Sequence, residues 1–302
     1  MYDVIIIGGG PAGLTAGIYL KRAGKTALLV EAEAFGGQII TSPEVENYPG
    51  IAKVSGYELA MKLFEQATDL GLETESDKII GISEENDGFT VKGESGDYRA
   101  KSVIIATGAK ARKLGLENED RLTGSGVSYC AVCDGAFFRD RVVAVNGGGN
   151  TAFEDAIFLS AYCKKVYLIH RRREFRAEEN LVSVLRAKPN VEFVLDSTVT
   201  SLVGQDKLEA VVLRDKNTDG TSTLPLDGLF VSVGRTPDTG YLKGFVGLDE
   251  GGYIVAGEDC KTDRKGVFVA GDCRRKLFRQ LTTAASDGTV AALNACAYLE
   301  LK

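Results

Sequence analysis

Two cysteines separated by two residues, Cys130 and Cys133, are followed directly by Asp134. Thiols at this spacing form either an exchanging redox pair, in which one sulfur attacks and the other resolves the mixed disulfide, or half of a zinc site. A structural zinc needs four ligands, and the single histidine, His170, lies beside arginines instead. The other cysteines form no second close pair: Cys163, Cys260, Cys273 and Cys296. We therefore predict a redox-active dithiol without a metal, and four cysteines that serve as small apolar residues.

A glycine-rich segment near the start of the chain, residues 8–13 (GGGPAG), follows an apolar run and precedes a stretch with helical character. A dinucleotide-binding fingerprint requires this order of strand, turn and helix. Gly8 permits the tight turn, Gly10 lets the backbone approach a pyrophosphate, and Gly13 lets helix and strand pack closely. Pro11 suits the first helical turn, whose unpaired N–H groups are available to phosphate.

The acid that such a fingerprint needs is Glu31, which closes the next predicted strand, residues 26–30. A carboxylate about 20 residues beyond the glycines is placed to accept hydrogen bonds from a ribose 2′-hydroxyl. Glycines that served packing alone would not require this acid. We therefore predict that the first site binds a dinucleotide with an unmodified ribose.

The chain contains a second copy of the same unit. A shift of 139 positions superposes Gly8 on Gly147, Gly10 on Gly149 and residues 25–30 on residues 164–169. The second fingerprint, residues 147–152 (GGGNTA), differs mainly in its last position, where Ala152 replaces the third glycine. An internal repeat of this kind predicts two nucleotide sites in one chain.

The two copies differ in charge at one position. Under the same shift Glu31 falls on His170, which is followed by Arg171 and Arg172, with Arg176 slightly further on. A carboxylate would repel a 2′-phosphate, whereas guanidinium groups hold it through charge-assisted and often bidentate hydrogen bonds. The alternative is a solvated basic face, which most charge runs are. The register with Glu31 favours NADPH at the second site.

Length and composition fit two soluble domains. The chain has 302 residues, 44% of them hydrophobic, and a formal net charge of −6. This charge argues against a general nucleic-acid binder, and no apolar run approaches the roughly 20 residues that span a bilayer. A signal-like n-region is lacking, which argues against a secreted disulfide framework. We expect a cytoplasmic protein.

The predicted order of strands places one domain inside the other. Strand-like runs at residues 102–108 and 228–234 end the two repeats, and residues 109–113 and 235–239 connect them. Pro237 and its neighbours favour a turn over a helix or strand in the second connection. The tail, a strand at residues 266–272 and a helix at 283–299, has no fingerprint of its own and returns to complete the first domain. We predict an α/β fold with two Rossmann-like domains. One comprises residues 1–112 and 240–302, and the other comprises residues 113–239.

These features together resemble the low-molecular-weight, NADPH-dependent thioredoxin reductases, a class of pyridine nucleotide-disulfide oxidoreductases. The resemblance runs nearly end to end, and its specificity lies in the ordered set of motifs. That set is residues 8–13, 36–38 (GGQ), 46–50 (ENYPG), 106–108 (ATG), 130–134, 147–152, 170–176, 271–272 (GD) and 279–280 (RQ).

The resemblance implies the cofactors FAD and NADPH and assigns residues to each. For FAD these are Gly8, Gly10, Pro11, Ala12, Gly13, Glu31, Gly36, Gly37, Gln38, Asn47, Ala106, Thr107, Gly108, Gly271, Asp272, Arg279, Gln280 and Leu281. For NADPH they are Gly147, Gly149, Asn150, Thr151, Ala152, His170, Arg171, Arg172 and Arg176. It also implies a homodimer, and a rotation that brings the nicotinamide and the dithiol to one flavin face in turn.

The implied reaction is the reduction of oxidised thioredoxin by NADPH, through FAD and the Cys130–Cys133 disulfide. Cys133 is the sulfur that would meet the flavin, and Asp134 would supply or take protons. Asp134 could instead be a turn residue before Gly135. Cys273, directly after Asp272, departs from the usual pattern and is interpreted as inert.

The sequence alone leaves other functions open. A related reductase could serve a glutaredoxin-like protein, a peroxidase system or a small-molecule disulfide. A ferredoxin-driven enzyme is disfavoured, because it would have no use for the arginines. From other classes, a flavin-bound redox sensor that does not turn over and a metal-binding interaction protein both require the double fingerprint to be accidental or vestigial.

Overall fold

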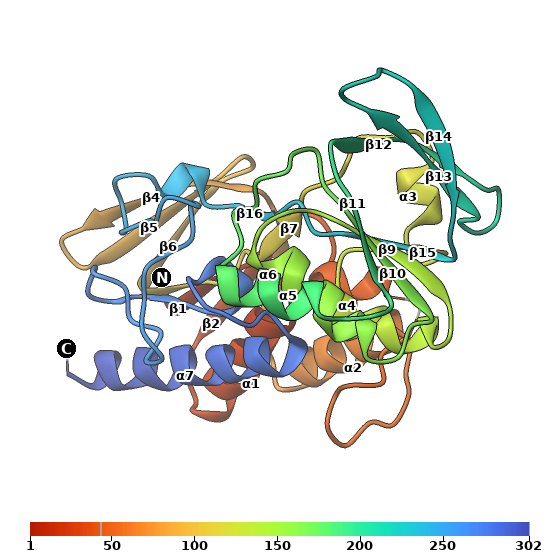
Figure 1. The fold of residues 1–302 in the computed structure, drawn as a ribbon. Helices are drawn as coiled ribbons and strands as arrows, with labels where there is room; N and C mark the ends of the chain where they lie inside the picture. Colours follow the sequence, from red (N-terminus) through yellow and green to blue (C-terminus); the bar gives the residue numbers. More distant parts are fainter. Residues whose placement is uncertain (43, 302) are drawn as a thin grey trace. The chain divides into compact units, whose positions relative to one another are not determined.

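The computed structural model describes residues 1–42 and 44–301 of the chain. The chain divides into two compact units, one of residues 1–110 and 236–302 and one of residues 111–235 (Figure 1). The second unit is therefore inserted in the first. Each unit has its own parallel sheet and its own hydrophobic clusters.

The first unit is built on a seven-stranded sheet with the order β3-β2-β1-β6-β5-β4, in which β17 also pairs with β6. Its parallel part comprises β1 (Tyr2–Ile7), β2 (Ala27–Glu31), β3 (Glu73–Ser76), β6 (Asp97–Ile105) and β17 (Val267–Val269). The hairpin of β4 (Ile79–Glu85) and β5 (Gly88–Gly93) adds the antiparallel strands.

Alternate residues of β1 face two different hydrophobic cores. Val4 and Ile6 lie in a cluster with α1 (Pro11–Arg22) and α7 (Leu281–Glu300), whereas Ile5 and Ile7 lie in one on the other side. Burial of both faces explains why β1 is a continuous apolar run. The helices α1 and α7 run side by side, and a Cβ at Gly288 would lie 2.2 Å from the Ala12 carbonyl oxygen (Figure 1).

One further helix and three 3₁₀ turns complete the first unit. They are η1 (Gly37–Thr41), α2 (Gly56–Asp69), η3 (Gly240–Leu242) and η4 (Gly271–Cys273). Within residues 1–42 and 44–301, no helix combines the length and the apolar character that crossing a bilayer requires.

The second unit contains a five-stranded parallel sheet with the order β11-β10-β9-β15-β8. Its strands are β8 (Val127–Ser128), β9 (Val142–Asn146), β10 (Lys165–Ile169), β11 (Val191–Val194) and β15 (Gly228–Val231). The helical elements are α3 (Glu119–Leu122), α4 (Ala131–Asp134), η2 (Gly135–Phe138), α5 (Asn150–Ser160) and α6 (Glu179–Arg186). An antiparallel sheet joins β12 (Ser197–Val203), β13 (Ala210–Asp215) and β14 (Thr221–Pro225).

The internal repeat is visible in both topology and hydrogen bonding. The order β3-β2-β1-β6 in the first unit corresponds to β11-β10-β9-β15 in the second. The Gly8 N–H donates to the Val30 carbonyl at 2.8 Å, and the Gly147 N–H donates to the Ile169 carbonyl at 3.1 Å. The predicted fold class, two Rossmann-like units of which one is inserted, is confirmed.

One local prediction is wrong. The sequence favours a turn at residues 235–239, but β16 (Arg235–Pro237) pairs with β7 (Ala109–Ala111) in a two-stranded sheet. In so small a sheet every strand is an edge strand, and proline is tolerated at an edge because its missing N–H need not pair. The connections at residues 109–113 and 235–239 thus contain short extended segments.

Candidate active site

The predicted cysteine pair is joined in the structure. Cys130 and Cys133 form a disulfide whose Cα atoms lie 5.3 Å apart. Cys130 is the N-cap of the single-turn helix α4, and its sulfur accepts a hydrogen bond from the Cys133 N–H at 3.2 Å. Cys133 is exposed and Cys130 is half-buried. The short helix thus holds both cysteines, of which Cys133 is the more exposed residue.

Asp134 holds its carboxyl group beside this disulfide through Ser128. The Ser128 hydroxyl donates to Asp134 Oδ2 at 2.5 Å and accepts from the Cys130 N–H at 3.1 Å. Burial raises the pKa of Asp134, and the hydrogen bond from Ser128 offsets part of that rise. The carboxylate caps no backbone N–H, and Gly135 has helical φ and ψ of −59° and −31°. The backbone here therefore does not adopt a glycine-dependent turn.

The remaining cysteines form no disulfide. Cys163, Cys260 and Cys273 are buried and Cys296 is half-buried. Burial raises the pKa of the thiol to about 11 in Cys163, about 12 in Cys260 and about 11 in Cys273. A thiol with so high a pKa forms little of the reactive thiolate at neutral pH. In the described part of the chain, no group of three or more histidine, cysteine or acidic side chains is placed to hold a metal.

The first fingerprint needs glycine at two positions. Gly8 has φ of +109°, and a Cβ there would lie 2.4 Å from the Ala106 carbonyl oxygen. A Cβ at Gly13 would lie 1.9 Å from the Gly8 carbonyl oxygen. At Gly10, the N-cap of α1, a Cβ would meet nothing nearer than Gly37 Cα at 4.0 Å. The backbone at Gly10 is thus open to a pyrophosphate.

Glu31, at the carboxyl end of β2, is held by two backbone amides. Its Oε2 accepts from the Gly9 N–H at 2.5 Å, and its Oε1 accepts from the Glu33 N–H at 2.8 Å. The carboxylate is therefore fixed against the glycine turn, where an adenosine ribose lies in this kind of fold.

Several predicted flavin residues gather at the same end of the first sheet. Gly37 has φ of +60°, and a Cβ there would lie 3.0 Å from Gly10 Cα. The Gln38 side-chain amide donates to the Ala109 carbonyl at 2.8 Å, next to the predicted residues 106–108. Asn47 is exposed. The Thr107 hydroxyl is buried, next to the thiol of Cys273. This open glycine cradle and buried hydroxyl fit a dinucleotide such as FAD.

A buried ion cluster supports the Gly271–Asp272 turn. Asp287 Oδ2 accepts from the Gly271 N–H at 3.0 Å and from Lys276 Nζ at 2.8 Å, and both carboxylate oxygens pair with Arg274 at 3.0 Å. Burial opposes ionisation, but these cations hold the pKa of Asp287 below its usual value. Nothing in the spacing of Asp287 links it to the turn, so the sequence does not mark it as a site residue.

Predicted residues at the start of α7 are also fixed. The Arg279 guanidinium donates to the Asp272 carbonyl at 3.3 Å and lies 4.2 Å from the ring centre of Tyr253. Gln280 is the N-cap of α7 and forms a reciprocal capping box with Thr283, so that Leu281 begins the helix.

The second fingerprint repeats the backbone geometry of the first, but different side chains surround it. A Cβ at Gly147 would lie 2.4 Å from the Ser232 carbonyl oxygen, and Gly149 caps α5 beside open space. The Asn150 amide exchanges hydrogen bonds with Glu178, at 3.0 Å and 2.9 Å. Thr151 is exposed and Ala152 is buried. The N-terminus of α5 is open to a second pyrophosphate.

His170 and Arg176 support the fingerprint. The ring of His170 lies against Gly148, where an added Cβ would be 2.3 Å from the ring, and burial lowers its pKa. The Arg176 N–H donates to the Gly148 carbonyl at 2.8 Å. Both residues thus contact Gly148 within the glycine turn.

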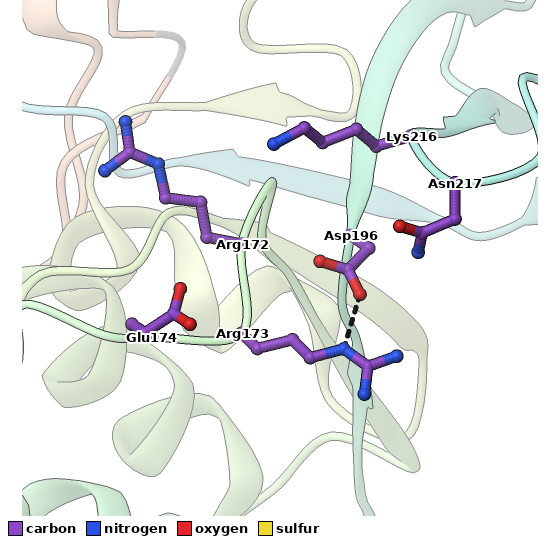
Figure 2. Close-up of a pocket in the computed structure, with 6 residues that line it drawn as sticks. All are labelled: Arg172, Arg173, Glu174, Asp196, Lys216 and Asn217. Atoms are coloured by element: carbon purple, nitrogen blue, oxygen red, sulfur yellow. Dashed lines mark hydrogen bonds and ion pairs between the residues drawn. The ribbon is translucent and has the colours of Figure 1, made fainter.

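The other arginines line a basic pocket with Lys216. One part, of about 400 Å³, is lined by Arg172, Arg173, Glu174, Asp196, Lys216 and Asn217 (Figure 2). An adjoining part, of about 430 Å³, is lined by Arg171, Arg172, Thr198, Arg214, Lys216 and Asp219. Lys216 lies just beyond β13, far in sequence from the arginines, and no motif marks it.

The cations of this pocket fall into two groups. Arg173 pairs with Asp196 at 2.6 Å, and Arg214 pairs with Asp219 at 2.7 Å. Arg172 and Lys216 form no ion pair in the described part of the chain, and Figure 2 shows the Lys216 chain extending toward the side where the Arg172 guanidinium lies. The Arg172 guanidinium and the Lys216 ammonium group are therefore available to bind an anion.

Two dinucleotide-binding units and a disulfide within one of them define a nucleotide-dependent disulfide oxidoreductase. The family described as "Pyridine nucleotide-disulphide oxidoreductase" matches residues 2–288, and the chain belongs to this family. The predicted cofactors, FAD and NADPH, are confirmed by this membership and by relatives that are thioredoxin reductases.

Curated relatives match over nearly the whole chain. A thioredoxin reductase of Listeria innocua is 43% identical over 99% of this chain and 94% of its own length. One of Peptoclostridium acidaminophilum is 40% identical over 99% and 98%. The crystal structure of thioredoxin reductase from Streptococcus pyogenes is 42% identical, covers 100% of this chain and 99% of that chain, and superposes with a TM-score of 0.96. The resemblance predicted from the motifs is confirmed.

Proposed function

We propose that this chain is a thioredoxin-disulfide reductase that passes electrons from NADPH through FAD and the Cys130–Cys133 disulfide to oxidised thioredoxin. The observation that carries this proposal is the dithiol, which lies in the same unit as the second fingerprint. Relatives that bear the name thioredoxin reductase cover the whole length of the chain, which supports thioredoxin as the acceptor.

The first unit would hold FAD, which when bound accepts hydride from NADPH and passes two electrons to the disulfide. Glu31 would bind the adenosine ribose, and the Gly10 backbone and the α1 N-terminus would bind the pyrophosphate. We assign Gln38 and Asn47 to the flavin side. Asp272, Arg279 and Gln280 would lie around the ribityl chain and the ring. The glycine cradle and the buried Thr107 hydroxyl support this assignment.

The second unit would hold NADPH. The α5 N-terminus would bind the pyrophosphate, while Arg171, Arg172 and Lys216 would bind the 2′-phosphate in the basic pocket. Arg173 contributes less in this proposal, because Asp196 already neutralises it. The pocket supports NADPH over NADH at this site.

The dithiol would carry out the exchange with thioredoxin. Reduction of Cys130–Cys133 takes up two electrons and two protons and yields two thiols. One thiolate then attacks the disulfide of thioredoxin, whose S–S bond breaks as a mixed disulfide forms. The second thiolate attacks that mixed disulfide, which re-forms Cys130–Cys133 and releases reduced thioredoxin. We assign Cys133 to the flavin-facing position and Asp134 to the proton transfers, a role that its raised pKa supports.

Three further expectations belong to this proposal. The nicotinamide site and the dithiol lie in one unit, so they would reach the flavin in turn, by rotation of that unit. We expect a homodimer on the strength of the family resemblance, and a cytoplasmic enzyme on the strength of the composition. The net charge of −6 supports a protein partner rather than nucleic acid.

The test is NADPH oxidation by the flavin-loaded protein, with thioredoxin and a chromogenic disulfide as separate acceptors. We expect thioredoxin-dependent turnover that Cys133→Ser abolishes, while Cys296→Ser, at a half-buried cysteine outside the pair, retains it. Reduction of the flavin by NADPH without turnover of thioredoxin would contradict the proposal. Turnover of the chromogenic disulfide alone would then indicate another disulfide acceptor, and no turnover at all would indicate a redox sensor.

A further inference from the structure

The hydroxyl of Ser128 connects the redox disulfide to Asp134. Ser128 ends β8, and its backbone pairs with Phe230 of the neighbouring strand β15. The side chain is buried, with 4% of the residue exposed. Its oxygen lies 3.1 Å from the Cys130 nitrogen and 2.5 Å from Asp134 Oδ2. A buried strand end thus holds one hydroxyl between the two groups that the reaction uses.

The direction of these hydrogen bonds follows from the donors present. The Cys130 N–H can only donate, so Ser128 Oγ accepts there. The serine hydrogen then has two acceptors in reach, Asp134 Oδ2 at 2.5 Å and the Cys130 carbonyl at 3.4 Å. The carboxylate is nearer and carries the charge, so it receives the stronger bond. The Ser128 hydroxyl therefore stabilises the ionised form of Asp134.

Other charged and titratable groups lie on the elements around α4. They are Asp155 of α5, Tyr162 just after it, Arg139 after η2, and Arg235, whose guanidinium donates to the Tyr129 carbonyl at 3.2 Å. Asp155 accepts a bond from Ser232 at 2.6 Å, and Arg139 lies 5.8 Å from the ring centre of Tyr162. Burial raises the pKa of Asp134, and the hydrogen bond from Ser128 lowers it. Removal of the Ser128 hydroxyl should therefore raise the pKa of Asp134 further.

We propose that Ser128 is a positioning residue, which orients the Asp134 carboxyl group against the dithiol and sets the pH range in which Asp134 transfers protons during exchange. This inference rests on the proposed function, because it assigns Ser128 a part in the same dithiol reaction. Each departing thiolate of the substrate takes up one proton as the enzyme dithiol gives up its own, and Asp134 would carry these protons between the two. In this proposal Ser128 acts through Asp134, to which its hydroxyl donates.

The test compares Ser128→Ala with Ser128→Thr, which keeps the hydroxyl, and with Ser160→Ala. Ser160 is a suitable control because it is a buried serine of the same unit, but its hydroxyl donates to the Ile157 carbonyl rather than to a carboxylate. Two quantities are measured as a function of pH. The first is the rate at which the prereduced enzyme reduces thioredoxin. The second is the rate of alkylation of Cys130 and Cys133 by iodoacetamide in the chemically reduced protein, followed by mass spectrometry.

We expect Ser128→Ala to slow thioredoxin reduction about tenfold at neutral pH, a part of the full effect of a general acid. The limb of the pH profile that reports Asp134 should move to higher pH in both measurements. Ser128→Thr should restore the wild-type limb, and Ser160→Ala should leave it in place. The inference would be overturned if the pH profiles of Ser128→Ala matched those of the wild type, or if Ser160→Ala shifted them equally. Failure of the wild-type enzyme to reduce thioredoxin would count against the proposed function, and the alkylation profile would still test Ser128.

Discussion

The two fingerprint sites share a topology and differ in charge at one place. In the first unit the strand after the fingerprint helix ends in Glu31, whose carboxylate is fixed by two backbone amides. In the second unit the equivalent strand, β10, ends at Ile169; His170 follows it, and Arg171 and Arg172 then line a basic pocket. Because the backbone hydrogen bonds at the two turns correspond, the fold alone does not select the cofactor. In the function proposed above, the side chains that follow the second strand do so.

The largest expected effect concerns the third position of each fingerprint, where the first unit has Gly13 and the second has Ala152. In Gly13→Ala the new Cβ would lie 1.9 Å from the Gly8 carbonyl oxygen, so backbone has to move. We expect a loss of about 3 kcal/mol in the free energy of unfolding and a Tm lower by roughly 10 °C. Thermal unfolding and the flavin absorbance per chain measure this effect.

The matched change in the second unit is Ala152→Gly. It removes a buried methyl group from a helix and should cost about 1 kcal/mol. Flavin content should stay at one per chain in this variant and fall in Gly13→Ala. Equal losses of stability and of flavin in both variants would contradict the prediction that only the first turn requires glycine at this position.

The second prediction removes the charges that distinguish the second site. In the double variant Arg171→Gln, Arg172→Gln, the Kd for 2′,5′-ADP should rise about 30-fold, since two partly exposed charge-assisted contacts together supply about 2 kcal/mol. The Kd for 5′-AMP, which lacks the 2′-phosphate, should change little. Isothermal titration calorimetry with the two nucleotides measures the difference.

Arg173→Gln is the control for this double variant, because the Arg173 guanidinium is already paired with Asp196 at 2.6 Å. It should weaken 2′,5′-ADP binding much less. An equally large loss in Arg173→Gln would show that the arginines act as a general basic face rather than as a phosphate site.

The third prediction concerns Glu31, the acidic residue of the first unit at the position equivalent to His170. Glu31→Gln keeps the shape of the side chain but has one acceptor oxygen for two N–H groups, those of Gly9 and Glu33. We expect the Kd of FAD for the apoprotein to rise about tenfold, which corresponds to roughly 1.4 kcal/mol. Fluorescence quenching of FAD on reconstitution measures it. Glu33→Gln, at an exposed residue that pairs with Lys110, should leave the Kd unchanged.

These sites also show how much of the molecule can be predicted from its sequence. The fingerprints, Glu31, the arginines and the cysteine pair occupy fixed positions relative to strands, so local spacing places them correctly. The repeat aligns Glu31 with His170, and equivalent positions in a duplicated unit occupy equivalent places in the fold. The fold class follows from the same repeat.

Other residues depend on contacts between distant segments, and spacing does not reveal them. Lys216 reaches the pocket because its backbone N–H donates to the Asp196 carbonyl at 2.7 Å, which ties the end of β13 to the segment after β11. Asp287 supports the Gly271 turn from within α7, a helix that carries no motif. Ser128 lies only two residues before Cys130, but its role becomes visible only when its oxygen is placed between Cys130 and Asp134.

The smallest expected effect concerns Lys216, which has no counterpart in the first unit's site. The Lys216 side chain is exposed and forms no ion pair in the described part of the chain, so it should add a modest, screened attraction to a 2′-phosphate. We expect Lys216→Gln to raise the Kd for 2′,5′-ADP about threefold at low salt and less at high salt, with the Kd for 5′-AMP unchanged. Lys207→Gln, an exposed lysine on the preceding turn that does not line the pocket, is the matched control. If both variants weakened 2′,5′-ADP binding equally and in a salt-dependent way, Lys216 would act only through the overall positive potential of the unit, not through a specific contact. The difference in charge between the two sites would then depend on Arg171 and Arg172 alone.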